Sequence, residues 1–427
     1  MSTIISISEH QVRTQPIAAP PLRVSFSWTL AGNAVYAITQ FGMLSVLAKL
    51  GSAAVVGQYA LALAISAPVF MFTNLQLRGV QATDACDEYE FADYFSLRCL
   101  STAVGVLTIA LIALLAGYDA DTKVVILLVA IAKAVETFSD VIAGHLQKFE
   151  RLDQVARALM IRGLASVFNF SAVFFVTRNL IISLSVLSLT WLATIGLYDF
   201  RVLARVLTSG NYFCFSGPIL RKLVWLSLPL GVVMALNSLS TNIPRYILER
   251  KLGTAELGVF ASLAYLVTAM SLISIALGQS VTARLSRLFA AGELNAFRSL
   301  TGKLLLLAAG LGMGGVAIAS MFGRPVLTFV YRPEYAEQVN LLIVMVVDAS
   351  VTAASIFLGF AMTAARCFRA QITIMIVNLV VTIVCTFLLL PHFGLLGAGY
   401  ALLSSSLVQA STSYLVLDRA IQNRSRA

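Results

Sequence analysis

The sequence predicts an all-α integral membrane protein of twelve transmembrane helices, and three observations support this fold class. Hydrophobic residues make up 59% of the 427 residues, charged residues make up 12%, and the mean hydropathy is +0.88. A soluble domain is about half apolar and about a quarter charged. The apolar residues also form repeated stretches of roughly 20 residues, the length that a helix needs to cross a hydrocarbon core about 30 Å thick. Almost nothing is left over for a soluble domain.

Twelve such stretches follow one another, most of them a few residues apart. They lie at residues 24–48, 57–77, 97–117, 122–146, 157–177, 180–204, 222–247, 256–281, 301–323, 338–363, 371–390 and 397–417. Arg178 and Asn179 divide the fifth stretch from the sixth, and Pro391 and Gly394 divide the last two, because turn formers and a lone Arg are disfavoured inside a span. Three connections are expected to be longer and polar: 78–96, 205–221 and 282–300.

The positive charges set the predicted orientation. With the N-terminus inside, 21 of the 30 Lys and Arg residues fall in inner segments, 8 fall in outer segments, and Lys133 lies within a span. Positive residues concentrate on the cytoplasmic side of membrane proteins. We therefore expect both termini to be cytoplasmic, with residues 1–22 a disordered tail rather than a signal peptide and residues 419–427 a second tail. The net charge of +10 reflects topology and not nucleic-acid binding.

A short repeat indicates two related halves. Lys49-Leu-Gly-Ser-Ala leads to Gly57-Gln-Tyr-Ala, and about 200 residues later Lys251-Leu-Gly-Thr-Ala leads to Gly258-Val-Phe-Ala. Six spans per half give both halves the same orientation, as in parallel repeats related by a pseudo-two-fold axis along the membrane normal. The predicted lobes are residues 23–210 and 211–418. We expect the glycines to serve the helix-hairpin turns rather than a substrate.

The fourth stretch carries the most informative polar side chains. At about 100° per residue, Lys133, Glu136, Asp140, Gly144 and Gln147 share a stripe about 80° wide. Each charge at mid-bilayer costs roughly 2.5–3.5 kcal/mol, so the stripe must face a water-filled cavity or charged partners. Two interpretations stay open. One is a structural ladder of ion pairs. In the other, Lys133 meets an anionic substrate group while Glu136 or Asp140 couples transport to a proton or ion.

Five further residues are candidates for the same functions. Asp348 is an isolated acid in the tenth stretch and a candidate for proton or ion coupling. Arg245 and Asn242 lie in the polar outer half of the seventh stretch, where Arg245 could bind phosphate or extend to the membrane interface. Asn33 and Gln40 are seven residues apart, hence on one face of the first stretch, where they suit either substrate binding or interhelical hydrogen bonds.

Signatures of enzymes and of metal sites are missing from the sequence. It has no P-loop and no HExxH motif, and its three His residues are scattered. Its five Cys residues show neither a CxxC pair nor metal-ligand spacing. The acidic connection 78–96 suits an amphipathic segment at the inner mouth better than a metal site. We predict a protein that is not an enzyme and holds no cofactor or metal.

Four local patterns resemble one known family. They are Leu47-Ala-Lys-Leu-Gly51 through Gly57-Gln-Tyr-Ala60 and Pro68; Leu77-Arg-Gly-Val-Gln-Ala-Thr-Asp84; Lys133-Ala-Val-Glu136 to Asp140 and Gln147-Lys-Phe-Glu-Arg151; and Ile243-Pro-Arg-Tyr246 with Leu252-Gly and Gly258-Val-Phe-Ala261. The sequence is similar to the polysaccharide-export branch of the multidrug/oligosaccharidyl-lipid/polysaccharide exporter superfamily, the flippases of O-antigen and exopolysaccharide assembly. Twelve spans in two halves agree with this resemblance along the whole chain.

The resemblance implies a V-shaped carrier in the inner membrane of a bacterium. Such a carrier would move an undecaprenyl-diphosphate-linked oligosaccharide from the inner to the outer leaflet by alternating access. Its coupling ion would be H⁺ or Na⁺. Membrane lipid would surround it, and a polysaccharide polymerase is a candidate partner. The resemblance assigns cationic cavity positions to Lys133 and Arg245. Glu136 and Asp140 make the fourth stretch acidic, so an antiporter of the same fold that exports small cations, and a membrane scaffold that transports nothing, stay as alternatives.

Overall fold

The computed structural model describes residues 22–84, 88–207 and 212–426, and their regular structure is entirely helical. The predicted N-terminal tail lies outside the described residues, except for Leu22. The first half contains α1 (Leu22–Leu50), α2 (Ala53–Thr73), α3 (Leu77–Thr83), α4 (Phe91–Leu115), α5 (Ala120–Lys148), α6 (Leu152–Thr177), α7 (Leu180–Thr194), a π-helix (Ile195–Asp199) and α8 (Phe200–Val206). The second half contains α9 (Gly217–Leu252), α10 (Thr254–Ala290), α11 (Leu294–Val330), a 3₁₀-helix (Pro333–Gln338), α12 (Val339–Ala364), α13 (Phe368–Phe393) and α14 (Leu395–Arg426).

Each of the twelve predicted apolar stretches is a helix, and most of the helices are longer than the stretches. The polar connection predicted at 282–300 is mostly helical, because α10 continues to Ala290 and α11 begins at Leu294. The segment 78–96 likewise holds the short α3 and the start of α4. Hydrophobicity ends where a helix leaves the lipid, but backbone hydrogen bonding continues for further turns into water. Helix α14 also continues through the predicted C-terminal tail, to Arg426.

Ten helices within the described residues are long and apolar enough to cross a membrane. The two other long helices are α5 and α14. Helix α5 carries the charged stripe, and α14 is rich in Ser and Thr. These two helices can span a bilayer only if their polar residues are buried against other parts of the protein.

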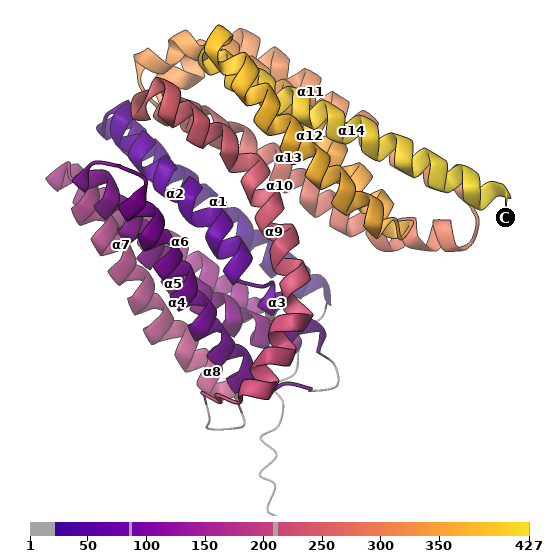
Figure 1. The fold of residues 1–427 in the computed structure, drawn as a ribbon, viewed down its shortest axis with the longest axis horizontal. Helices are drawn as coiled ribbons and strands as arrows, with labels where there is room; N and C mark the ends of the chain where they lie inside the picture. The colour runs from indigo at the N-terminus through magenta and orange to yellow at the C-terminus, as the bar shows by residue number, and fades with distance from the viewer. Residues whose placement is uncertain (1–21, 85–87, 208–211, 427) are drawn as a thin grey trace, which may run out of the picture.

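The helices form two bundles, which we call the N-lobe (α1–α8) and the C-lobe (α10–α14). Figure 1 shows the two lobes meeting at one end and diverging toward the other. Within the N-lobe, α1 packs on α6, and α5 is surrounded by α2, α4 and α7. Within the C-lobe, α12 is central. Helix α9 runs along the seam and contacts α2 of one lobe and α13 of the other.

Two glycines inside helices allow a close approach of the lobes. A Cβ on Gly57 of α2 would lie 1.7 Å from the carbonyl oxygen of Thr254, and a Cβ on Gly258 of α10 would lie 1.9 Å from that of Ala53. Each glycine therefore packs on the carbonyl four residues before the other, as a local two-fold axis requires. The prediction that these two glycines serve hairpin turns is wrong. Gly253, with φ +95° at the end of α9, does have that role.

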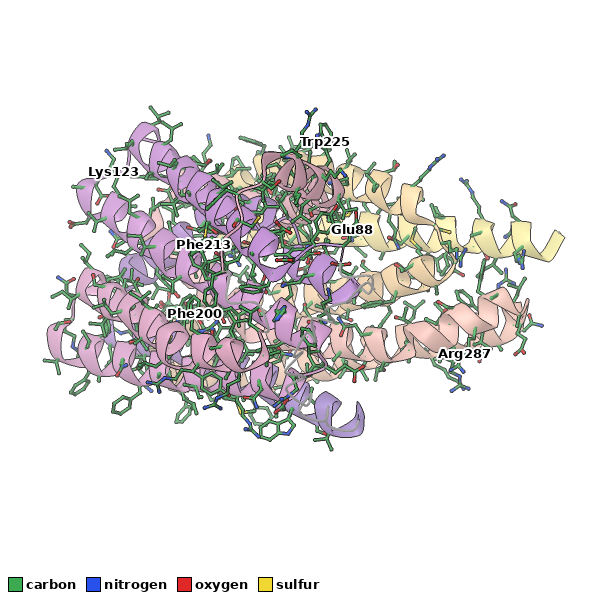
Figure 2. The ribbon with its side chains drawn as sticks, turned by 90° about the horizontal axis from the view of Figure 1, so that it is seen from below. Glu88, Lys123, Phe200, Phe213, Trp225 and Arg287 are labelled. Carbon is green, nitrogen blue, oxygen red and sulfur yellow. The ribbon has the colours of Figure 1, made fainter. Side chains whose placement is uncertain are left out.

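Four hydrogen bonds among the described residues cross the seam near this crossing, and each ends on a main-chain carbonyl. Lys49 Nζ donates to the oxygen of Phe329 at 2.6 Å, Arg332 Nε to that of Lys49 at 3.1 Å, Arg250 Nη2 to that of Ala116 at 2.6 Å, and Tyr246 Oη to that of Ala64. These donors lie at helix ends predicted to face outside. Figure 2 places Lys123, predicted outside, and Arg287, predicted inside, toward opposite ends of the molecule.

Candidate functional site

The charged stripe of α5 is built as the helical periodicity predicts. Asp119 caps the helix by accepting from the backbone N–H of Thr122, and the helix then runs unbroken to Lys148. Lys133 Nζ lies 2.7 Å from Glu136 Oε2, and the Tyr36 hydroxyl of α1 donates to Glu136 Oε1 at 2.8 Å. The Lys133 ammonium also lies 5.5 Å from the ring centroid of Trp191 on α7, a cation–π distance.

Asp140 joins α5 to two other helices. Its carboxylate lies 3.5 Å from Arg78 Nη1 of α3 and 3.3 Å from Arg98 Nη2 of α4. Arg98 is fully buried, and its Nη1 donates to Asn74 Oδ1 at 2.5 Å. Arg78 Nε also donates to Gln147 Oε1 at 3.1 Å. The stripe thus faces charged and polar partners, and in this conformation it forms the ladder that was one of the two interpretations.

A second buried ion pair was not predicted from the sequence. Arg162 of α6 lies 2.9 Å from Asp199, the last residue of the π-helix, and Ser139 of α5 bridges them. The two charged residues are 3% and 4% exposed. Arg98 and Arg162, two of the 21 positive residues assigned to inner segments, are both buried inside the N-lobe. The sequence did hold one indication of the Arg162–Asp199 pair. Asp199 is an acid inside the apolar stretch 180–204, and an acid in the membrane needs a partner.

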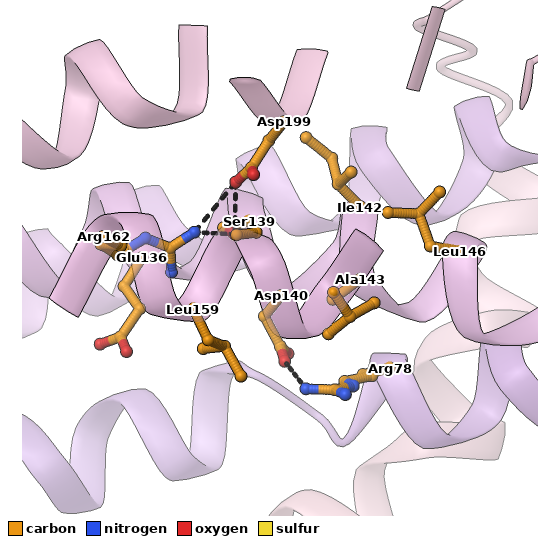
Figure 3. Close-up of a pocket in the computed structure, with 12 residues that line it drawn as sticks. Arg78, Glu136, Ser139, Asp140, Ile142, Ala143, Leu146, Leu159, Arg162 and Asp199 are labelled. Carbon is orange, nitrogen blue, oxygen red and sulfur yellow. Dashed lines mark hydrogen bonds and ion pairs between the residues drawn. The ribbon is translucent and has the colours of Figure 1, made fainter. Parts of the chain in front are cut away.

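One cavity collects these groups. Its volume is about 100 Å³, and Figure 3 shows Glu136, Asp140 and Arg78 along its length, with Arg162 and Asp199 at its side. Small and apolar side chains of α5 and α6, such as Ala143 and Leu159, form the rest of the wall. A space of this size holds a few water molecules and is far too small for a glycan.

The Arg162–Asp199 pair is expected to be essential for stability. Removing one partner of a buried ion pair leaves an uncompensated charge, which costs about 3–5 kcal/mol. Asp199→Ala should therefore lower the thermal unfolding midpoint of the detergent-purified protein strongly, whereas the double variant Arg162→Leu/Asp199→Leu should recover much of the loss. Equal midpoints for Asp199→Ala and the wild type would contradict this assignment.

Arg245 stands apart from these paired charges. Its Nη1 donates to Asn242 Oδ1 at 3.1 Å, its Nε is buried without a hydrogen-bond partner, and no carboxylate of the described residues pairs with it. Tyr265 of α10, which the sequence did not single out, is close enough to interact electrostatically with both Arg245 and Lys133.

The remaining predicted residues lie elsewhere. Asn33 is exposed and its amide donates to the Thr29 carbonyl of its own helix at 2.9 Å. Gln40 lies two turns later on the same face of α1. It is half-buried, and its amide nitrogen has no hydrogen-bond partner among the described residues. Asp348 lies inside the C-lobe, where it accepts from the Ser406 hydroxyl of α14 at 2.7 Å. None of these hydrogen bonds connects the three residues to Lys133 or Arg245.

Around the ion-pair cluster and Arg245, cations outnumber carboxylates. Three carboxylates, those of Glu136, Asp140 and Asp199, face four cations in the N-lobe, and Arg245 adds another from α9. An anionic group could take up the excess charge beside Arg245, and a cation would be repelled there.

The comparisons with known proteins agree with this architecture. No family model matches the chain. It is 27% identical over 395 residues to a protein of Staphylococcus aureus named "Capsular polysaccharide biosynthesis protein CapF", covering 92% of this chain and 99% of the relative. A multidrug resistance MATE family transporter of the MOP superfamily in an inward-facing conformation superposes with a TM-score of 0.74 at 11% identity, over 93% of this chain and 99% of that one.

A second solved structure is the lipid II flippase MurJ in an inward closed conformation. It superposes with a TM-score of 0.71 at 10% identity, over 94% of this chain and 90% of that one. At these identities the two structures establish the fold alone, which is that of a membrane transporter. The sequence match and the shared fold together confirm the resemblance of this chain, along almost its whole length, to the polysaccharide-export branch of the multidrug/oligosaccharidyl-lipid/polysaccharide exporter superfamily.

Proposed function

We propose that this protein moves an undecaprenyl-diphosphate-linked oligosaccharide from the inner to the outer leaflet of a bacterial inner membrane by alternating access. In this proposal twelve helices cross the membrane and both termini are cytoplasmic. The observation that carries it is Arg245, a half-buried arginine of α9 at the seam of the two lobes, whose Nε is buried and which has no carboxylate partner among the described residues. A diphosphate is the kind of bidentate acceptor that guanidinium groups favour.

Lys133 completes the proposed headgroup site. Its ammonium pairs with Glu136 in this conformation, and a phosphate can take the place of that carboxylate. A diphosphate cannot cross lipid unaided, and cationic groups between two lobes give it a shielded path. The name of the Staphylococcus aureus relative, which refers to capsular polysaccharide biosynthesis, is consistent with a glycan substrate.

The coupling to an ion gradient is proposed for Glu136 and Asp348. Once a phosphate takes Lys133, Glu136 keeps the Tyr36 hydroxyl as its partner among the described residues and can accept a proton or a cation. Asp348 has a single hydroxyl donor, from Ser406, in the C-lobe. Asp140 was also predicted for coupling, but its two arginine partners suit it better to holding α3 and α4 against α5.

Deletion of the gene, followed by analysis of membrane glycolipids, tests the proposal. We expect an undecaprenyl-diphosphate oligosaccharide to accumulate on the inner leaflet and surface polysaccharide to be lost, and the wild-type gene on a plasmid should reverse both effects. Unchanged glycolipids together with new sensitivity to cationic drugs would instead identify an antiporter. No change in glycolipids or drug sensitivity would leave the scaffold alternative.

A further inference from the structure

A second cavity lies at the C-terminal end of α5, on the side predicted to be cytoplasmic. Its volume is about 260 Å³, and it is enclosed by α3, the start of α4, the end of α5 and the end of α8. The cavity does not belong to the ion-pair cluster, because Arg78 of α3 points to the first cavity and Gln81, one turn later, lines the second. Its lining consists of Gln81, Tyr89, Glu90, Phe91, Tyr94, His145, Lys148, Phe149, Val206 and Leu207.

Gln81 is the residue that points to a ligand. It is 1% exposed, and neither its amide nitrogen nor its amide oxygen has a hydrogen-bond partner among the residues that the structure describes. Buried amides are almost always paired, since an unpaired polar group costs about 1–3 kcal/mol. Gly144 of α5 leaves the room for this side chain, because a Cβ there would lie 2.5 Å from Gln81 Oε1. The structure thus places two donors and an acceptor at the wall of a cavity.

Aromatic rings form much of the remaining wall. Tyr89 and Tyr94 meet edge to face at 6.0 Å between centroids, and His145 lies between Phe91 and Phe149, with centroids 5.0 Å away on each side. These contacts fix the rings in place. An occupant must therefore present an apolar face to the rings as well as polar groups to Gln81.

The charges of the cavity favour a neutral occupant. Lys148 is the cation of the lining, and its Nζ lies 3.5 Å from Asp84 Oδ2, while Glu90 contributes an acid. No excess positive charge is left here for a phosphate, unlike the surroundings of Arg245. A sugar ring meets these demands, because its hydroxyls donate and accept while its C–H faces are apolar. The volume lies just below the roughly 300–1,000 Å³ typical of drug-sized ligands, so one ring is the expected size.

We propose that this cavity binds one neutral, hexose-sized sugar ring of the glycan headgroup before the headgroup enters the space between the lobes. The assignment of the ring to the transported glycan rests on the proposed function. The binding of a sugar ring in the cavity does not, so the two can fail separately.

Saturation-transfer NMR on the full-length protein in lipid nanodiscs tests the proposal, with the methyl glycosides of glucose, galactose, N-acetylglucosamine and N-acetylgalactosamine as probes. At least one probe should receive saturation from the wild type. Gln81→Leu should reduce that signal at least fivefold, and Phe149→Ala, a change at an exposed ring, should weaken it. Gln154→Leu, a substitution at the same end of the N-lobe outside the cavity, should leave it unchanged.

Two readouts separate binding from folding and from transport. Gln81→Leu should keep or raise the thermal unfolding midpoint, because it removes an unpaired buried amide; a purely structural glutamine would lower it. Lys133→Ala and Arg245→Ala should retain sugar binding even where export is lost. A wild type that gives no signal with any of the four probes, or an equal signal from Gln81→Leu, would overturn the proposal.

Discussion

Export of the polysaccharide should fall by roughly 10- to 100-fold in Lys133→Ala and in Arg245→Ala, and should be abolished in the double variant. Each substitution removes one charge-assisted contact to the diphosphate, worth about 1.5–3 kcal/mol, and each 1.4 kcal/mol changes an equilibrium tenfold. Surface polysaccharide measured in the complemented deletion strain is the readout, with the amount of protein in the membrane determined in parallel.

The matched controls are an exposed lysine and an exposed arginine of the C-lobe. Lys303→Ala and Arg287→Ala remove the same charges far from the seam, and both should export normally. Lys133→Arg should keep more activity than Lys133→Ala, because a cation remains. Wild-type polysaccharide in both Lys133→Ala and Arg245→Ala would remove these residues from the headgroup site.

Replacement of either seam glycine should stop transport altogether. At Gly57 and at Gly258 an added Cβ would overlap main-chain atoms of the opposite lobe, 1.7 and 1.9 Å away, and a main chain cannot rotate aside. Gly57→Val or Gly258→Val must therefore hold the lobes apart at the end predicted to face outside. The hydrogen bonds around the crossing end on carbonyls, and each contributes only a modest free energy. The wild-type contact can therefore separate and form again in each transport cycle.

Gly310→Val is the control for the glycine variants. Gly310 lies within α11, and a Cβ there would have no atom within 4 Å, so export should persist. Cysteines at Ala53 and Thr254, in a background without the native cysteines, give a second readout: a short bifunctional thiol reagent should link them in the wild-type seam and fail to do so in Gly57→Val. Efficient linking together with full export in Gly57→Val would show that the crossing does not move in transport.

The positions of the helices could be predicted from composition and periodicity, for a definite physical reason. A segment in lipid must satisfy its own backbone hydrogen bonds, so each apolar stretch has to be a helix. The stripe of α5 followed equally from the sequence, because charges at about 100° spacing cannot face lipid. Helix ends such as Ala290 and Arg426 were missed, since hydropathy ends at the membrane surface and the helices continue into water.

The sequence by itself determined the membrane class, the helices and the need for partners opposite Lys133, Glu136 and Asp140. Only the tertiary structure decided which partners these are, because Arg78, Arg98 and Tyr36 come from helices whose packing no local pattern encodes. The tertiary structure also showed that Gly57 and Gly258 lie at the contact between the lobes. The sequence could not show this, because a helical glycine looks the same in sequence whether it contacts lipid or another backbone. Periodicity fixes the direction of a side chain about its own helix axis, whereas contacts between helices depend on how the whole set fills space.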